Sequence, residues 1–230
     1  MEGEKLINEA INAGFTVERV YINSGALSRG EAVSQGYPGE TALEEKLFLE
    51  LARTETPGPY IAVVAGKTAA KAHGSGNKNR LLILDRINDP GNAGTIIRAA
   101  LAAGMDEVLC LKGTADIFSD KAVRASAGAI FHIPVIEGLS AEECLSYVKE
   151  AGLKLFVCEA GGNCLFDTGL AGRIAIVIGN ESRGPQAVLK EAADTIVGIP
   201  MAEESESLNA ASAASVVMYE ALRQRMKKKS

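Results

Sequence analysis

The sequence predicts an α/β protein in which a small N-terminal α/β domain precedes a larger domain built on a mostly parallel sheet. After residue 80, short uninterrupted apolar segments alternate with helical ones, which is typical of parallel strands covered by helices on both faces. Just before this region, GKTAAKAHGSGNKN is rich in Gly, Lys and Asn, as interdomain linkers are. We therefore expect a first domain at residues 1–65, a linker at 66–79 and a second domain at 80–230.

The spacing of apolar residues indicates the elements of the first domain. Glu4–Ala13 has the pattern of an amphipathic helix, and Val17–Ile22 has that of a strand. Thr41–Arg53 is expected to form a second helix, and the short apolar segment Tyr60–Ala65 a second strand.

The second domain is expected to alternate strands and helices to its end. Its strand candidates are Leu81–Leu84, Glu107–Leu111, Ile133–Ile136, Lys154–Cys158, Ile174–Ile178 and Thr195–Ile199. Its helices are expected near residues 94–103, 119–128, 140–151, 184–192 and 208–225, the last of them rich in alanine.

Composition indicates a folded protein rather than a membrane-spanning or disordered one. Of 230 residues, 47 % are hydrophobic and 23 % charged, which is enough apolar material for a core. No apolar run reaches the ~18 residues of a membrane span, and the acidic start MEGEKLINEA is unlike a secretion signal. The cysteines lack CxxC or zinc-type spacing, so we expect reduced thiols in a cytoplasmic protein that holds no metal.

The charge distribution leaves a nucleic-acid partner open. A net charge of −5 argues mildly against one, because phosphate binding depends on Lys and Arg. However, residues 1–50 hold nine acids against four Lys or Arg, whereas residues 61–84 carry basic charges alone, Lys67 and Lys71 among them. An ordinary solvated linker is the simpler explanation of these charges, so charge by itself decides nothing.

Three loops that follow expected strands are rich in ligand-binding groups. They are NDPGNAG at residues 88–94, GNESRGP at 179–185 and PMAEESESLN at 200–209. In open parallel sheets, ligands bind beyond the carboxyl ends of the strands. We therefore expect a binding site where these loops meet.

The polar residues of these loops have structural as well as functional interpretations. Asn92 is expected at the N-cap of a helix that also carries Arg98, and a helix N-terminus with a cation suits an anion such as phosphate. A cap and a surface arginine would account for the same residues. Glu181 could pair with a nearby arginine, and Ser207 could cap the last helix, with Asn209 in its first turn.

Several other chemistries lack their sequence signatures. No GxGxxG follows a strand and no GxxxxGK[ST] occurs, which disfavours a nicotinamide or flavin site and a P-loop. His73 and His132 are the only histidines, so a serine-hydrolase triad or a histidine-rich metal site is weakly supported.

Taken in order, the three loops resemble the motifs of the SpoU branch of the SPOUT RNA methyltransferases. The segments concerned are NDPGNAGTIIRAALAAG (88–104), SDKAVRASAGAIFHIPV (119–135), IVIGNESRGP (176–185) and IPMAEESESLNAASAAS (199–215). The N-terminal segments EGEKLINEAI and ARTETPGPYIAVV resemble the substrate-binding domain of rRNA-type members. Relatives carry a further strand and helix before this point, so we expect that domain to be N-terminally shortened.

The resemblance implies a fold, a cofactor and a site. The fold is an α/β domain with a trefoil knot near its C-terminus, an exception to the rule against threaded chains, and it forms a homodimer. The cofactor is S-adenosylmethionine, and the family's cofactor-binding positions match Gly179, Asn180, Ile199, Met201 and Leu208. The family's functional polar positions match Asn92, Arg98, Glu181, Ser207 and Asn209.

The expected reaction is methyl transfer to a ribose 2′-hydroxyl of RNA, and the N-terminal domain and basic linker favour rRNA over tRNA. We expect Arg98 to orient the phosphate beside the target ribose and to stabilise the developing alkoxide, while Asn92 fixes the arginine or the ribose. Glu181 is expected to orient partner groups, and Ser207 with Asn209 to hold the third loop. Three alternatives stay open: a non-catalytic RNA-binding protein of this fold, a tRNA methyltransferase, and an enzyme that methylates a base nitrogen.

Overall fold

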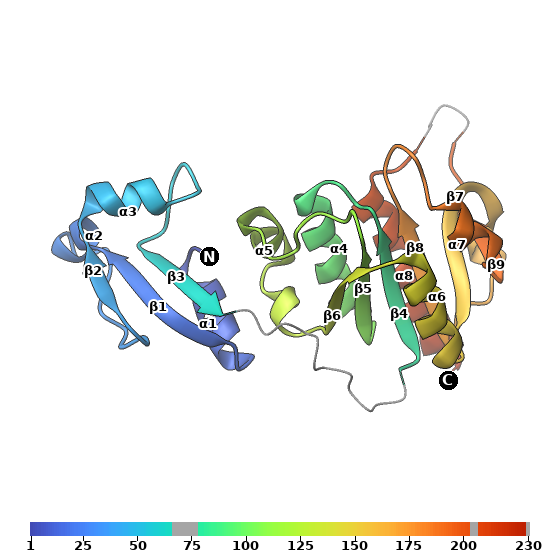
Figure 1. Cartoon of the computed structure of the whole chain (residues 1–230), viewed down its shortest axis with the longest axis horizontal. Coiled ribbons are helices and arrows are strands. Elements are labelled where there is room, and N and C mark those ends of the chain that lie inside the picture. Colours follow the sequence, from blue (N-terminus) through green and yellow to red (C-terminus); the bar gives the residue numbers. More distant parts are fainter. Residues whose placement is uncertain (66–77, 203–206, 229–230) are drawn as a thin grey trace. The chain divides into compact units, whose positions relative to one another are not determined.

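The computed structural model of the chain describes residues 1–65, 78–202 and 207–228, and Figure 1 shows its helices and strands. The chain divides into two compact units, Met1–Thr68 and Ala69–Ser230, each with its own sheet and core. Of the linker expected at residues 66–79, only Lys78 and Asn79 are among the described residues. The linker therefore stays a prediction.

The first unit is a small α/β sandwich with strand order β2-β1-β3. The central strand β1 (Thr16–Asn23) runs antiparallel to β3 (Tyr60–Ala65) and parallel to the short β2 (Thr41–Leu43). The helices of this unit are α1 (Glu4–Asn12), α2 (Ser24–Ser28) and α3 (Glu45–Leu51). Its core includes Ile7 of α1, Val20 and Ile22 of β1, and Tyr60 of β3.

The helix predicted at Thr41–Arg53 is wrong at its start. Residues Thr41–Leu43 form β2 instead, because they pair in register with the last residues of β1. Glu44 then has extended dihedral angles, φ −53° and ψ 135°, and the helix begins only at Glu45. Pairing at the sheet edge overrides the helical pattern of the segment.

The second unit is built on a parallel sheet with strand order β6-β5-β4-β8-β7-β9. Each pairing between neighbouring strands is parallel, which confirms the predicted α/β class. The strands are β4 (Arg80–Asp85), β5 (Glu107–Leu111), β6 (Val135–Leu139), β7 (Lys154–Cys164), β8 (Ile174–Gly179) and β9 (Thr195–Gly198). Thus β4 and β8, which carry the first two candidate loops, are central neighbours.

Helices cover both faces of this sheet. They are α4 (Pro90–Ala102), α5 (Asp120–Ser126), α6 (Ala141–Glu150), α7 (Ala187–Glu191) and α8 (Ala210–Lys228). Side chains of α6 and α7 pack against Leu81 and Ile83 of β4 in one apolar cluster. Leu82 and Leu84 alternate with them and are also fully buried, so they face the other side, where α4 and α8 pack together.

Two non-glycine residues of this unit, Arg86 and Ala127, have a backbone conformation that suits glycine better. Ala127 ends α5 with φ 48° and ψ 37°, in the left-handed region, and its side chain is exposed. A side chain there costs about 1 kcal/mol, since its Cβ crowds the following carbonyl oxygen.

We expect Ala127→Gly to raise the free energy of unfolding by about 0.5–1 kcal/mol, because the relief of strain exceeds the added unfolded-state entropy. Denaturant unfolding of both proteins measures the difference. Ala99→Gly, inside α4, is the matched control, and it should lower stability by about 1 kcal/mol. A lower free energy of unfolding for Ala127→Gly would show that the backbone at Ala127 is not strained.

Candidate active site

A pocket of about 260 Å³ lies at the carboxyl edge of the second sheet, where β8 and β9 end and α8 begins. Its walls come from segments far apart in sequence. They are Cys158, Glu159 and Ala160; Ile178, Gly179, Asn180, Glu181, Gly184 and Pro185; Val197, Ile199 and Met201; and Ser207, Leu208, Ala210 and Ala213. The pocket therefore joins the second and third candidate loops, as ligand sites of open parallel sheets do.

All the residues expected to bind the cofactor line this pocket, namely Gly179, Asn180, Ile199, Met201 and Leu208. Glu181 and Ser207, expected among the catalytic residues, line it too. The apolar side chains of Met201 and Leu208 are 37 % and 42 % exposed. Apolar groups left exposed beside a pocket suit a ligand with an apolar surface of its own.

Sequence reasoning missed the contribution of β7 to the pocket. This strand runs past its predicted end at Cys158 to Cys164, and its pairing with β9 is irregular between Cys158 and Asn163. The irregularity places Glu159 on the wall, where its carboxylate pairs with Lys190 at 2.9 Å. Burial raises the pKa of the Cys158 thiol to about 12, so this thiol stays protonated and is a poor nucleophile.

A chain of side-chain hydrogen bonds joins the three candidate loops beside the pocket, through Glu181 on its wall. The Asn92 side chain donates to Glu181 Oε1 at 2.9 Å and accepts from Asn209 Nδ2 at 3.1 Å. The backbone N–H of Asn88 donates to the other Glu181 oxygen at 3.4 Å. Glu181 thus bonds to the first loop rather than to an arginine, and Asn92 links the second loop to the third.

Two helix caps differ from the sequence prediction. Asp89, not Asn92, caps α4, since its carboxylate accepts from the Asn92 backbone and Pro90 occupies the first turn. Asn209, not Ser207, caps α8, because its side-chain oxygen accepts from the backbone N–H groups of Ala211 and Ser212. Asn209 therefore orients the helix start and Asn92 at the same time.

Arg98 lies apart from this cluster. It is exposed on α4 and is absent from the pocket lining. Within the described part of the chain, its guanidinium has no hydrogen-bond or ion-pair partner. The structure therefore brings Asn92, Glu181 and Asn209 into contact and leaves Arg98 facing solvent.

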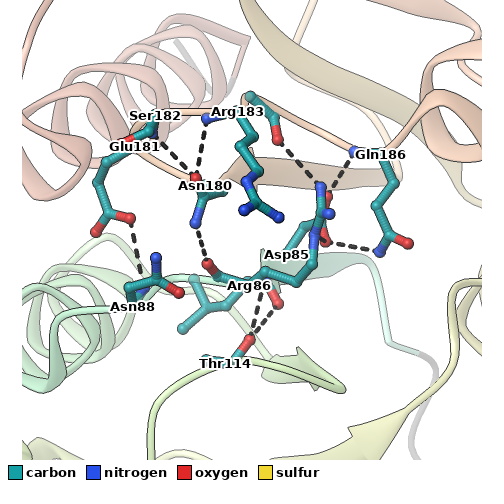
Figure 2. Close-up of polar contacts among 11 residues, drawn as sticks. Asp85, Arg86, Asn88, Thr114, Asn180, Glu181, Ser182, Arg183 and Gln186 are labelled. Atoms are coloured by element: carbon teal, nitrogen blue, oxygen red, sulfur yellow. Dashed lines mark hydrogen bonds and ion pairs between the residues drawn. The ribbon is translucent and has the colours of Figure 1, made fainter.

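The backbone of the loop after β8 is held by hydrogen bonds to a side chain of the same loop, as Figure 2 shows. The Asn180 side chain accepts from the backbone N–H groups of Ser182 and Arg183, at 3.0 and 2.9 Å, and donates to the Arg86 carbonyl at 2.8 Å. A Cβ on Gly179 would lie 2.4 Å from the Pro185 nitrogen, so only glycine lets the loop fold back this closely.

The described residues offer little for other classes of site. Among them, no group of three or more His, Cys, Asp and Glu side chains is arranged to hold a metal ion. No helix in the part of the chain that the structure describes has the length and apolar character needed to cross a membrane.

Comparison with known families decides the relationship of the chain. The family model described as "SpoU rRNA Methylase family" matches residues 79–219, which include all three candidate loops. The chain belongs to the SpoU family. The match to this SpoU protein confirms the resemblance that its three motifs indicated.

Proteins similar to this chain are named as rRNA 2'-O-methyltransferases or SpoU methyltransferases. The chain is 34 % identical to 23S rRNA (guanosine(2553)-2'-O)-methyltransferase RlmP of Bacillus subtilis (strain 168), over 95 % of this chain and 86 % of the relative. It is 33 % identical to 23S rRNA (uridine(2479)-2'-O)-methyltransferase of Streptomyces viridochromogenes, over 81 % of this chain and 68 % of the relative. The crystal structure of the SpoU methyltransferase AviRb from Streptomyces viridochromogenes in complex with the cofactor AdoMet has a TM-score of 0.87 and 30 % identity, over 98 % of this chain and 89 % of that one.

We expect Gly179→Ala to lower the free energy of unfolding by about 1–3 kcal/mol, because the added methyl group overlaps the backbone at Pro185. Gly172→Ala is the matched control, since a Cβ there meets nothing within 4 Å, and its stability should change little. Denaturant titration compares the two variants. Equal stabilities would mean that the loop accommodates a side chain at Gly179 without strain.

Proposed function

We propose that this SpoU protein is an S-adenosylmethionine-dependent methyltransferase acting on a ribose 2′-hydroxyl of rRNA. The observation that carries the proposal is the pocket. Its walls include the second and third family motifs, and Asn92 links these to the first. The relatives named above are 23S rRNA 2′-O-methyltransferases, and the AviRb structure holds AdoMet.

The pocket suits S-adenosylmethionine in its chemistry. Ile178, Val197 and Leu208 offer apolar walls for the adenine ring, and the exposed Met201 would cover it. The loop residues Gly179, Asn180, Ile199, Met201 and Leu208 would hold the cofactor largely through backbone groups. Glu181, together with Glu159 in its ion pair with Lys190, places carboxylates beside a ligand that carries a sulfonium and an ammonium group.

When bound, S-adenosylmethionine supplies an activated methyl group, so the attacking oxygen needs only alignment and the loss of its proton. Arg98 has no partner among the described residues, which leaves its guanidinium available for the phosphate beside the target ribose. The guanidinium carries N–H donors and no acceptor, so it would act there as a donor that stabilises the developing alkoxide, and not as a base. The neighbouring phosphate assists removal of the 2′-hydroxyl proton.

The remaining polar residues keep this arrangement in place. Asn92 is held between Glu181 and Asn209, so its amide fixes the relation of the three loops. Ser207 lines the pocket next to Leu208, where it would support the third loop around the bound cofactor.

We also propose a homodimer, a knotted second domain and an RNA-binding role for residues 1–65. Tyr219 and Met226 support the dimer, since they lie seven positions apart on α8 and are 49 % and 64 % exposed.

The knot is supported by the insertion of β8 between β4 and β7 and by family membership. We further propose that the enzyme works in the cytoplasm, because the relatives named above act on 23S rRNA.

The cofactor assignment is tested by calorimetric titration with S-adenosylmethionine and, separately, with NADH. We expect the former to bind with a Kd of about 1–100 μM and the latter not to bind, because the nicotinamide signatures are missing. A folded protein that binds neither would favour a non-catalytic RNA-binding protein of this fold.

We expect Arg98→Ala to lower methyl transfer to rRNA by about a hundredfold or more and to change the Kd for S-adenosylmethionine by less than about twofold. Lys149→Ala on α6 removes the same charge from another exposed site and serves as control. Resistance of the product RNA to alkaline cleavage identifies a 2′-O-methyl group. A parallel loss of cofactor affinity in Arg98→Ala would mark this arginine as structural, and methylation of tRNA or of a base would redirect the assignment.

A further inference from the structure

A buried carboxylate lies directly beneath the loop that lines the cofactor pocket. Asp85, the last residue of β4, has an exposed fraction of 0 %. One of its oxygens accepts from the Gln186 backbone at 2.7 Å, and the other accepts from Gln186 Nε2 at 2.7 Å and from Arg86 Nε at 3.0 Å. A buried charge needs such partners, because its desolvation is otherwise uncompensated.

The next residue, Arg86, ties the same loop at two further points. Its Nη2 donates to the Gly184 carbonyl at 3.3 Å, and its own carbonyl accepts from Asn180 Nδ2 at 2.8 Å. Its backbone N–H donates to Thr114 Oγ1 at 3.2 Å. Arg86 makes these contacts with φ at 59°, a left-handed conformation that a non-glycine residue adopts only when its surroundings hold it there.

These contacts anchor the loop at both ends without entering the pocket. Figure 2 shows Asp85 and Arg86 lying below the segment from Asn180 to Gln186. Asn180, Glu181, Gly184 and Pro185 of that segment line the pocket, whereas Asp85, Arg86 and Gln186 do not. The bonds to Asp85 therefore act on the pocket through the loop alone.

We propose that Asp85 and Arg86 are positioning residues that hold the 180–186 loop in its cofactor-binding conformation before the cofactor arrives. The inference rests on the proposed function, since it assigns this network to the S-adenosylmethionine pocket. A loop ordered in advance binds more tightly, because less conformational entropy is lost on binding.

The donor pattern explains why the residue must be a carboxylate. Three N–H donors converge on the two oxygens of Asp85. An asparagine has nearly the same shape, but in either orientation its NH₂ group faces at least one of these donors. Asp85→Asn thus loses at least one bond of the network and leaves a buried donor without a partner.

The second sheet contains a matched control at its opposite edge. Glu107, the first residue of β5, is also 0 % exposed; it pairs with Lys78 and accepts from the Tyr147 hydroxyl at 2.5 Å. Glu107→Gln therefore removes a buried, hydrogen-bonded carboxylate from the same domain, away from the pocket. Any general effect of destabilising the domain should appear equally in this variant.

The experiment measures the Kd for S-adenosylmethionine by calorimetry on the full chain and the Tm of each protein without cofactor. We expect Asp85→Asn to raise the Kd about tenfold or more, and Glu107→Gln to change it less than about twofold despite a similar loss of Tm. Equal Kd values for wild type and Asp85→Asn would overturn the inference, as would an equal rise in both variants. No binding by the wild-type chain would overturn the proposed function itself, and this inference with it.

Gln186→Ala keeps the test decisive if Asp85→Asn does not fold. This change removes one bond to Asp85, keeps the backbone bond at the same residue, and affects a half-buried side chain. We expect its Kd to rise about threefold while its Tm falls little. A Kd equal to that of the wild type would count against a positioning role.

Discussion

The Asp85 carboxylate lies fully buried where β4 ends, and donors from two separate segments converge on it. A buried charge is tolerated only when its hydrogen-bond partners are in position. The carboxylate therefore constrains the positions of Arg86 and Gln186, which donate to it. Arg86 takes a left-handed turn, and Thr114 receives its backbone N–H. The loop after β8 closes back over the turn, and its residues Asn180, Glu181, Gly184 and Pro185 line the pocket.

This edge of the sheet also requires backbone segments to pass very close to one another, at Gly179 and at Gly162. Gly179 permits the loop to return against Pro185, and Gly162 lies so near the backbone of β9 that a Cβ there would be 2.8 Å from the Val197 carbonyl carbon. At both places backbone packs directly against backbone, so a residue with a side chain would push the two segments apart.

The sequence predicted most strands because these depend on a local apolar pattern, but it missed β2, and the strand expected at Ile133–Ile136 forms instead at Val135–Leu139. Glu107–Leu111 and Tyr60–Ala65 match the structure residue for residue. Helix starts were less certain, since several residues near each start can act as a cap. Pro90 favours Asp89 as the cap of α4, a signal that the choice of Asn92 passed over. Ser207 and Asn209 posed the same ambiguity at α8, and the structure resolves it in favour of Asn209.

The site was predictable in its loops but not in its contacts. The bonds from Asn92 to Glu181 and Asn209 span 89 and 117 residues, and no local pattern specifies them. Glu159 escaped prediction for a similar reason, because it reaches the pocket through an irregular pairing of β7 with β9. Such contacts depend on how strands are ordered in the sheet, which local spacing does not record.

The two long helices α4 and α8 are fastened together at both ends. Asn209 bonds to Asn92 near their starts, and Arg225 Nη2 donates to the Ala103 carbonyl, which follows the end of α4, at 2.6 Å. Two helices bonded to one another at both ends resist sliding along each other. The start of α4, where Asn92 also bonds to Glu181, therefore shares its support with α8.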